Sequence, residues 1–230
     1  MPEHRYPVLM FAAGFGTRMK HLTEDRPKPL IEVAGRPLID HALELARGAG
    51  CAPIVANLHY KAGMLAAHLE PKGVLTVTEQ PEILETGGGL RNALPLLGPG
   101  PVITMNTDAI WAGPNPVSDL IAAWDPLRMD ALLTCVPLQQ AVGHSGQGDF
   151  VLDAEGRASR GPGAVYGGVQ LIKTDLLHEI KETSFSLNLL WDRMLANGRL
   201  FGLHYPGTWC DVGHPGGIAL AERMLEARDV

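Results

Sequence analysis

The chain has 230 residues, of which 46% are apolar and 19% are charged, so it can bury a sizeable core and does not belong to the disordered class. Its formal net charge of −6 disfavours general nucleic-acid binding, which needs a basic surface, although a few local cations can still hold a small anion. Three scattered cysteines indicate neither a disulfide framework nor a zinc site, and the lack of a signal peptide or of any apolar run of about 18 residues predicts a cytoplasmic protein without a membrane span.

Strands and helices are predicted to alternate through the first 136 residues. Short continuous apolar runs are typical of strands buried on both faces, and helix-compatible segments begin at proline or end at glycine. In chain order we predict strands over 8–13, 53–58, 74–78, 102–105 and 131–136, and helices over 37–50, 61–69, 89–97 and 117–124. This alternation predicts an α/β fold of three layers, α/β/α, Rossmann-like, with a mainly parallel central sheet.

The regular alternation of predicted strands and helices ends after residue 136. We predict strands over 150–152, 165–172, 200–204 and 208–212, and helices over 175–180, 186–197 and 214–227. No linker or shift of composition marks a boundary, so we expect residues 1–230 to form a single domain. The second half is expected to join the open edge of the sheet.

A glycine-rich turn, AAGFGTR at residues 12–18, follows the first predicted strand. Ligands of open α/β sheets bind beyond the carboxyl ends of the strands, where glycines let backbone N–H groups approach phosphate oxygens. The turn is not a dinucleotide fingerprint, because Met19 replaces the third glycine, and no P-loop motif is present. Arg18 offers a bidentate fork, and Lys28 between two prolines offers a rigidly held point charge, so the combination predicts a triphosphate site. The alternative is a plain βα turn followed by a surface loop.

A long stretch around this turn, LMFAAGFGTRMKHLTEDRPKPLIEVAGRPLIDHAL at residues 9–43, resembles the signature of the sugar-1-phosphate nucleotidyltransferases. Three further stretches, LETGGGLRNALPLLG at 84–98, GQGDF at 146–150 and WCDVGHP at 209–215, resemble the small N-acetylmuramate-1-phosphate uridylyltransferases within that family. The resemblance implies a nucleotidyltransferase fold and an enzyme that transfers UMP from UTP to a sugar 1-phosphate, with N-acetylmuramate 1-phosphate as the expected acceptor. It also implies a Mg²⁺ cofactor.

The resemblance assigns roles at the nucleotide site. Arg18 would hold the β- and γ-phosphates, and Lys28 would lie on the α-phosphate, so these two residues are the expected catalytic cations. Gln80 would read the pyrimidine, because one amide can donate and accept hydrogen bonds at the same time. The expected nucleotide-binding residues are Ala13, Gly14, Gly16, Thr17, Gln80, Glu85, Thr86, Gly87 and Asn106.

Two aspartates are expected to hold the metal, because Mg²⁺ usually takes one or two carboxylates together with phosphates. Asp108 follows the strand predicted over 102–105, and by resemblance Thr107 stands where the family commonly has glycine. Asp211 lies in the stretch that resembles the family's W-x-D-x-G. Alone, an aspartate at a strand end is often a turn residue or a helix cap.

The sugar site is the least specific part of the resemblance. Gly148, Asp149 and Tyr166 occupy places where relatives hold the hexose. Residues 1–136 would therefore form the nucleotide-binding half, and residues 137–230 the sugar-binding half with the C-terminal helix.

Three alternatives remain open from the sequence. One is a mannose-1-phosphate guanylyltransferase, another a glucose-1-phosphate uridylyl- or thymidylyltransferase, and the third a non-catalytic nucleotide-sugar sensor. The expected ligands are a nucleoside triphosphate, with UTP preferred, and a sugar 1-phosphate, with neither nucleic acid nor membrane as a partner. Either a monomer or a small homo-oligomer fits the sequence.

Overall fold

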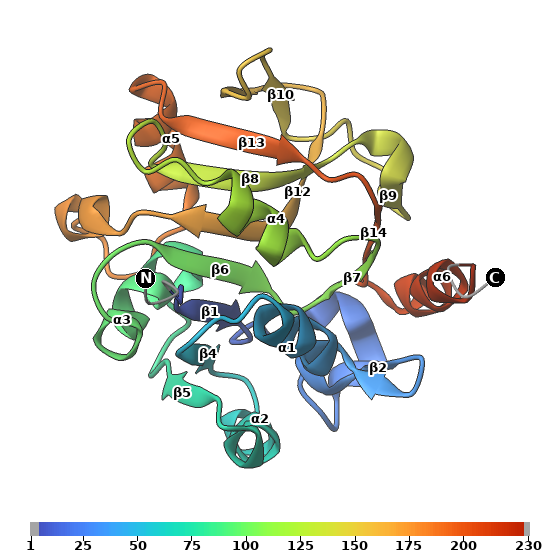
Figure 1. Ribbon diagram of the computed structural model, residues 1–230. Coiled ribbons are helices and arrows are strands. Elements are labelled where there is room, and N and C mark those ends of the chain that lie inside the picture. The colour runs from blue at the N-terminus through green and yellow to red at the C-terminus, as the bar shows by residue number, and fades with distance from the viewer. Residues whose placement is uncertain (1–4, 228–230) are drawn as a thin grey trace.

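The computed structural model describes residues 5–227 and has a seven-stranded sheet at its centre (Figure 1). The strands of this sheet, in spatial order, are β13 (Leu200–His204), β8 (Ala131–Val136), β12 (Val165–Ile172), β6 (Val102–Asn106), β1 (Val8–Phe11), β4 (Ile54–Leu58) and β5 (Leu75–Thr78). All neighbouring pairs are parallel except those that β12 makes with β6 and β8. The prediction of a mainly parallel α/β sheet is confirmed.

Helices cover both faces of the sheet and form two apolar cores. On one face lie α1 (Leu38–Gly48), α2 (Ala62–Leu69) and α4 (Pro116–Ala123), and on the other lie α3 (Glu85–Leu97) and α5 (Asn188–Ala196). The alternation of side chains along β1 divides its residues between the cores, with Val8 and Met10 in one and Leu9 in the other. The three layers predicted from the sequence are therefore present.

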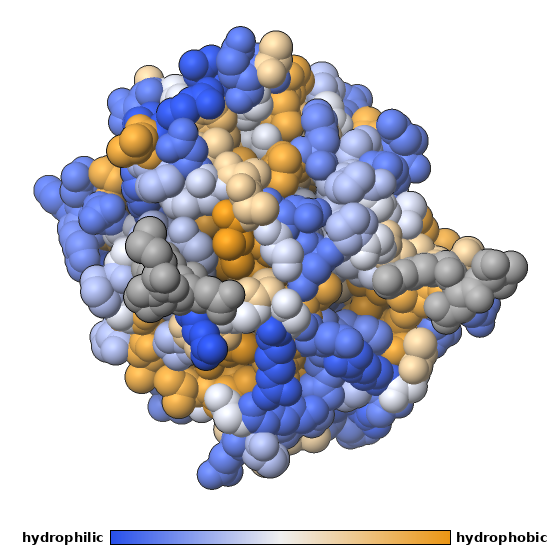
Figure 2. Space-filling view, in the orientation of Figure 1, coloured by the Kyte–Doolittle hydropathy of each residue, from blue (hydrophilic) through white to orange (hydrophobic). Residues whose placement is uncertain are grey.

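A smaller apolar core lies beside the main sheet. It joins the C-terminal helix α6 (Pro215–Glu226) to a three-stranded sheet of β7 (Ala109–Ala112), β14 (Thr208–Asp211) and β9 (Ala141–Val142) and to the hairpin of β2 (Glu32–Val33) and β3 (Arg36–Pro37). A separate hairpin consists of β10 (Phe150–Leu152) and β11 (Ala158–Arg160). Short 3₁₀ helices complete the chain: η1 (Thr17–Thr23), η2 (Lys28–Leu30), η3 (Glu70–Lys72), η4 (Leu138–Gln140) and η5 (Asp175–Glu179). Figure 2 shows apolar side chains beside α6, together with other apolar areas among the polar side chains of the same face.

The sequence led us to expect that the second half of the chain joins the open edge of the sheet. The structure shows that this is only partly correct. The strand β13 does lie at that edge, but β12 is inserted between β6 and β8 and runs antiparallel to both. Seven of the eight residues of β12 are buried. A strand that is apolar on both faces needs helices above and below it, and an interior position between two other strands supplies them.

A buried chain of hydrogen bonds fixes β12 in this position. The indole Nε1 of Trp191 on α5 donates to Gln170 Oε1 at 2.9 Å, and Gln170 Nε2 donates to Thr104 Oγ1 on β6 at 3.0 Å. The Gln170 side chain is fully buried, so both of its polar groups depend on these partners. The chain of bonds joins a helix, the inserted strand and the strand that leads to Asp108.

Replacing Gln170 by leucine is expected to destabilise the protein by about 2 kcal/mol, because the Trp191 indole N–H would remain buried without its acceptor and the Thr104 hydroxyl would keep only its bond with Tyr166. Urea denaturation at equilibrium measures the change as a lower midpoint with an unchanged slope. A midpoint equal to that of the wild type would show that these polar groups find other partners.

Candidate active site

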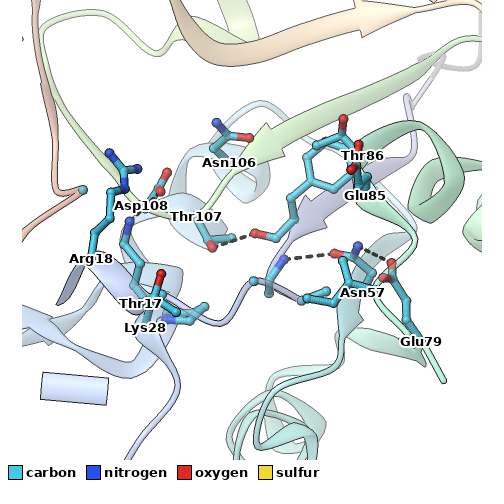
Figure 3. A pocket seen from close by; sticks show the side chains of 18 of the residues that line it. Thr17, Arg18, Lys28, Asn57, Glu79, Glu85, Thr86, Asn106, Thr107 and Asp108 are labelled. Carbon is cyan, nitrogen blue, oxygen red and sulfur yellow. Dashed lines mark hydrogen bonds and ion pairs between the residues drawn. The ribbon is translucent and has the colours of Figure 1, made fainter. Parts of the chain in front are cut away.

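A cavity of about 480 Å³ opens at the carboxyl ends of β1, β4, β5 and β6 (Figure 3). Parallel strands end at the same edge of a sheet, so residues far apart in the sequence meet there. The cavity is lined by Phe11, Ala12, Ala13, Gly14, Gly16, Thr17, Arg18, Lys28, Pro29, Asn57, Glu79, Ile83, Glu85, Thr86, Asn106, Thr107, Asp108, Ser186 and Gly213. Most residues predicted for the nucleotide site are therefore brought together in one place.

The glycine-rich turn is shaped to bring Lys28 to the cavity. Gly16 has φ +65°, a left-handed conformation that favours glycine, and it precedes the 3₁₀ helix η1. A Cβ atom at Gly16 would lie 2.7 Å from Lys28 Cβ, so the close approach of these two segments also requires glycine. The turn after Pro27, closed by the Leu30 N–H on the Pro27 carbonyl at 2.9 Å, carries Lys28 against it.

Lys28 forms an ion pair with Asp108 inside the cavity. Lys28 Nζ lies 2.7 Å from Asp108 Oδ2, and only 8% of the lysine is exposed. Asp108 stands between β6 and β7, at the point where the chain leaves the main sheet for the small one. A lysine this buried needs a partner of opposite charge, and Asp108 supplies it.

The pairing of two strands of the small sheet brings Asp211 beside Asp108. In the antiparallel pair of β7 and β14, Asp211 lies opposite Ala109, and the Val212 N–H donates to the Asp108 carbonyl at 2.8 Å. Burial raises the pKa of the Asp211 carboxyl, and the negative charge of Asp108 raises it further, although Lys28, Arg18 and His214 act in the opposite direction. The two carboxylates therefore lie close enough to repel each other.

Arg18 lies next to this acidic pair. A Cβ atom added to Gly213 would lie 2.6 Å from Asp211 Oδ2 and 3.1 Å from Arg18 Nη1, so both side chains pack around that glycine. Arg18 itself is largely exposed. Arg18, Lys28 and Asp108 thus line one end of the cavity, and Asp211 lies beside them, outside the lining.

The donor set of this end of the cavity suits a hard divalent cation that is also bound by phosphates. Asp108 and Asp211 supply carboxylate oxygens, and Mg²⁺ usually takes one or two carboxylates together with substrate oxygens. Within residues 5–227 no group of three or more acidic, histidine or cysteine side chains forms a cage that could hold a metal without substrate. The residues present therefore fit a metal that arrives with a nucleotide.

Thr107 explains how the chain tolerates the departure from the glycine that the family resemblance led us to expect. Its side chain is buried in the cavity wall, and its hydroxyl donates to the Phe11 carbonyl at 2.8 Å. This bond ties the carboxyl end of β6 to that of β1. The threonine thus fastens the edge on which Asp108 stands.

The opposite end of the cavity is formed by the start of α3 and the loop before it. Glu85 and Thr86 line it, and Glu85 has φ +58°, an unusual conformation for a residue with a side chain. Three of the residues predicted for the nucleotide and metal sites, Gln80, Gly87 and Asp211, are not part of the cavity lining. Gln80 is exposed, and Gly87 is buried with its N–H donating to the Phe185 carbonyl at 2.8 Å. A Cβ atom at Gly87 would collide with the Phe185 ring.

The predicted sugar-binding residues lie outside the lining of this cavity. Gly148 has φ +84°, and a Cβ atom there would collide with the Gly163 carbonyl. Asp149 Oδ2 accepts from the Tyr166 N–H at 2.8 Å. The Tyr166 ring packs edge-on against Trp191, with centroids 4.9 Å apart, and burial raises the pKa of its hydroxyl. Their role in sugar binding stays a prediction.

Nine residues of the cavity wall were not among the predicted site residues: Phe11, Ala12, Pro29, Asn57, Glu79, Ile83, Thr107, Ser186 and Gly213. Asn57 and Glu79 are polar residues at the ends of β4 and β5, and a polar residue that closes an apolar strand was the one signal available for them. Ser186 and Gly213 come from segments far along the chain, so no local pattern indicates them.

Comparison with known proteins places this chain among the nucleotidyltransferases. Residues 8–180 match the MobA-like NTP transferase domain. The chain is 42% identical to the N-acetylmuramate alpha-1-phosphate uridylyltransferase of Caulobacter vibrioides, an alignment that covers 96% of this chain and 97% of that protein. It is 32% identical to the protein of the same name from Neisseria meningitidis serogroup B, over 90% of this chain and 92% of that protein.

A solved structure shares the fold at lower sequence identity. The crystal structure of a putative glucose-1-phosphate thymidylyltransferase from Bacillus anthracis in complex with a sucrose superposes with a TM-score of 0.80 at 17% identity, covering 98% of this chain and 96% of that one. In the described part of the chain, none of the helices combines the length and the apolar character needed to cross a bilayer.

Replacing Asp211 by asparagine is expected to stabilise the metal-free protein at neutral pH. The raised pKa means that the folded state binds the proton of Asp211 more tightly than the unfolded state does. The contribution of Asp211 to the free energy of unfolding therefore falls as the pH rises from the ordinary aspartate pKa of about 3.9 through the raised pKa of the folded state. Thermal unfolding in chelator should show a higher Tm for Asp211→Asn at pH 7 and a smaller difference near pH 3. A lower Tm at pH 7 would contradict the proposed repulsion.

Proposed function

Because the chain belongs to the MobA-like NTP transferase family, we propose that it transfers UMP from UTP to a sugar 1-phosphate, forming a UDP-sugar and releasing pyrophosphate. N-acetylmuramate 1-phosphate is the proposed acceptor, since the Caulobacter and Neisseria relatives carry that name over nearly their whole lengths. The observation that carries the proposal is the meeting of Asp211 with Arg18, Lys28 and Asp108, the three of which line one end of the cavity. A pure sensor would not need an arrangement of charges that lowers its own stability.

The nucleophile of this reaction needs no general base. A phosphate monoester has a second pKa of about 6, so the acceptor phosphate is already a dianion near neutral pH. Its oxygen attacks the α-phosphorus of UTP, the bond from that phosphorus to the bridging oxygen breaks, and pyrophosphate leaves with the electron pair. Among the lining residues described above there is no histidine that could serve as a base. Catalysis is then a matter of alignment and of charge compensation.

Lys28 and Arg18 divide the work on the triphosphate. The buried ammonium of Lys28 compensates the charge that develops around the α-phosphorus, and the exposed fork of Arg18 holds the leaving phosphates. The backbone of residues 13–17 lines the cavity beside them and supplies N–H donors to phosphate oxygens. When UTP binds, its phosphates replace Asp108 as the partner of Lys28.

Asp108 and Asp211 are the residues that would hold Mg²⁺. When bound, the cation polarises phosphoryl oxygens and neutralises the charge of the two polyanionic substrates. The repulsion between the two carboxylates favours binding of a cation, because the cation removes the repulsion.

The two halves of the chain would divide the substrates between them. Residues 1–136 supply all of the cavity wall except Ser186 and Gly213, which fits the nucleotide. Residues 137–230, with Gly148, Asp149 and Tyr166, would hold the sugar. We further propose that the enzyme works in the cytoplasm, as a monomer or a small homo-oligomer, and that it reuses a cell-wall sugar in peptidoglycan recycling.

Replacing Lys28 by alanine is expected to lower kcat by about 10² or more while changing the KM for UTP far less, because the lysine acts mainly on transition-state charge. Steady-state pyrophosphate release measures both constants. Lys181→Ala is the control, since Lys181 is exposed and lies outside the lining of the cavity. An unchanged kcat/KM would remove Lys28 from the mechanism.

A panel of triphosphates and sugar 1-phosphates tests the assignment itself. UTP with N-acetylmuramate 1-phosphate should release pyrophosphate faster than any pairing with GTP, and kcat/KM should favour UTP over GTP by roughly tenfold or more, because a mismatched base leaves buried polar groups unpaired. Excess chelator should abolish the activity. Equal use of GTP would overturn the uridylyl assignment, and release of no pyrophosphate from any pair would favour the sensor.

A further inference from the structure

The side chain of Asn57 connects two segments of the cavity wall (Figure 3). Asn57 lies on β4, between β1 and β5, and only 3% of it is exposed. Its Oδ1 accepts from the Ala12 N–H at 2.9 Å, at the start of the glycine-rich turn. Its Nδ2 donates to Glu79 Oε1 at 2.7 Å, just after β5. One neutral amide thus satisfies a donor on one side and an acceptor on the other, which neither a carboxylate nor an apolar side chain can do.

Glu79 carries the connection onward to the loop before α3. It is 1% exposed, and its second oxygen, Oε2, accepts from the Leu84 N–H at 2.8 Å. Its main chain is held as well, because the Glu79 N–H donates to the Leu58 carbonyl at 2.7 Å and His59 Nδ1 donates to the Glu79 carbonyl at 2.9 Å. No lysine or arginine within residues 5–227 pairs with this carboxylate, so its hydrogen bonds are what hold it in place.

The first residue of α3, directly after the loop that Glu79 closes, holds an unfavourable conformation. Glu85 follows Leu84 directly and has φ +58°, which costs about 1 kcal/mol for a residue with a side chain. α3 packs directly on the side chains of Asn57 and Glu79, so it leaves no room for the loop to move toward the helix. A Cβ atom at Gly89 would lie 2.7 Å from Glu79 Oε1 and 2.8 Å from Asn57 Nδ2.

The residues after Asn57 support the glycine-rich turn from outside. The Phe15 ring packs against His59 and Tyr60, with centroids 5.3 Å and 5.7 Å apart. The Tyr60 hydroxyl donates to the Thr23 carbonyl at 2.9 Å, at the end of η1. The end of β4 therefore contacts the triphosphate turn on one side and the loop before α3 on the other.

We propose that Asn57 is a positioning residue, which through Glu79 sets the distance between the triphosphate turn and the loop that faces the base. The inference rests on the proposed function, since it assumes that one nucleotide spans both segments. The α-phosphorus must lie in line with its attacker while the base occupies its own slot, and a displacement of either segment misaligns the other. Asn57 acts through Ala12 and Glu79 and needs no contact with the substrate.

Titration calorimetry with UTP and with GTP tests this coupling without the acceptor sugar. Asn57→Leu has a similar shape and removes both hydrogen bonds, and Asn92→Leu, at an exposed position on α3, is the matched control. We expect Asn57→Leu to weaken UTP binding by roughly tenfold and to reduce the preference for UTP over GTP, while the control binds as the wild type does. Thermal unfolding shows that each variant is folded at the temperature of the titration.

A double variant separates a connected path from two independent contacts. If Asn57 acts through Glu79, adding Glu79→Gln to Asn57→Leu should cost little more than the larger of the two single changes. Fully multiplicative losses of affinity would show that the two side chains act separately and would overturn the proposal.

Asn57→Asp provides a rescue that depends on pH. Two carboxyl groups in hydrogen-bond contact share one proton, and the shared proton restores the donor that Glu79 needs. His59, which follows β4 directly, is a titratable side chain in contact with this pair, through its Nδ1 and the Glu79 main-chain carbonyl. At each pH, the association constant of this variant for UTP is divided by that of the wild type. This ratio should approach one at low pH and fall as the pH rises. A ratio that does not change with pH would contradict the donor role.

The outcomes distinguish the coupling from the assignment on which it rests. Variants that bind UTP and GTP like the wild type, even with a lower Tm, would make Asn57 a structural residue only and leave the uridylyl assignment intact. A wild type that binds UTP and GTP equally would overturn the uridylyl assignment. The coupling would then still be measured by the loss of affinity of Asn57→Leu for either nucleotide. A wild type that binds neither nucleotide would overturn both.

Discussion

The ammonium of Lys28 meets the carboxylate of Asp108 at 2.7 Å at the carboxyl edge of the sheet, and the construction of the site follows from keeping these charges there. A buried ammonium without a partner would cost several kcal/mol. Lys28 can therefore stay charged inside the cavity only because the carboxylate of Asp108 compensates its charge. A triphosphate brings its own negative charge and can take over that compensation. The exchange frees the oxygens of Asp108 at the moment when a polyanion arrives.

Glycines at three places let other segments approach this pair and its surroundings. Gly16 permits contact with the stem of Lys28, Gly213 lets Arg18 and Asp211 pack together, and Gly89 lets α3 lie directly on Asn57 and Glu79. In each case the missing Cβ atom leaves room for a polar or charged neighbour. The site is therefore assembled by close approach of backbone to side chain, which only glycine allows.

Stability and function conflict at the acidic end of the cavity. Asp211 is half-buried next to Asp108, and the pKa of its carboxyl is raised by both desolvation and repulsion. The fold tolerates this because the antiparallel pairing of β7 and β14 is anchored in the small core under α6. At the other end, Glu79 is a buried carboxylate without a cation, stabilised by two donated hydrogen bonds. The two ends differ in what stabilises their carboxylates: a counter-charge at one and neutral donors at the other.

Local patterns in the sequence predict the features that depend on neighbours along the chain. The alternation of strands and helices through residue 136, the glycine-rich turn at residues 12–18 and the restricted backbone around Lys28 follow from local periodicity, glycine conformation and proline restriction. The insertion of β12 between β6 and β8, the meeting of Asp108 with Asp211, and the bridge from Ala12 through Asn57 to Glu79 became visible only in the folded chain. The bridge spans 45 and 22 residues of sequence on its two sides. Such pairings are selected by the burial of whole faces and by the matching of single donors with single acceptors, and neither leaves a periodic pattern in the chain.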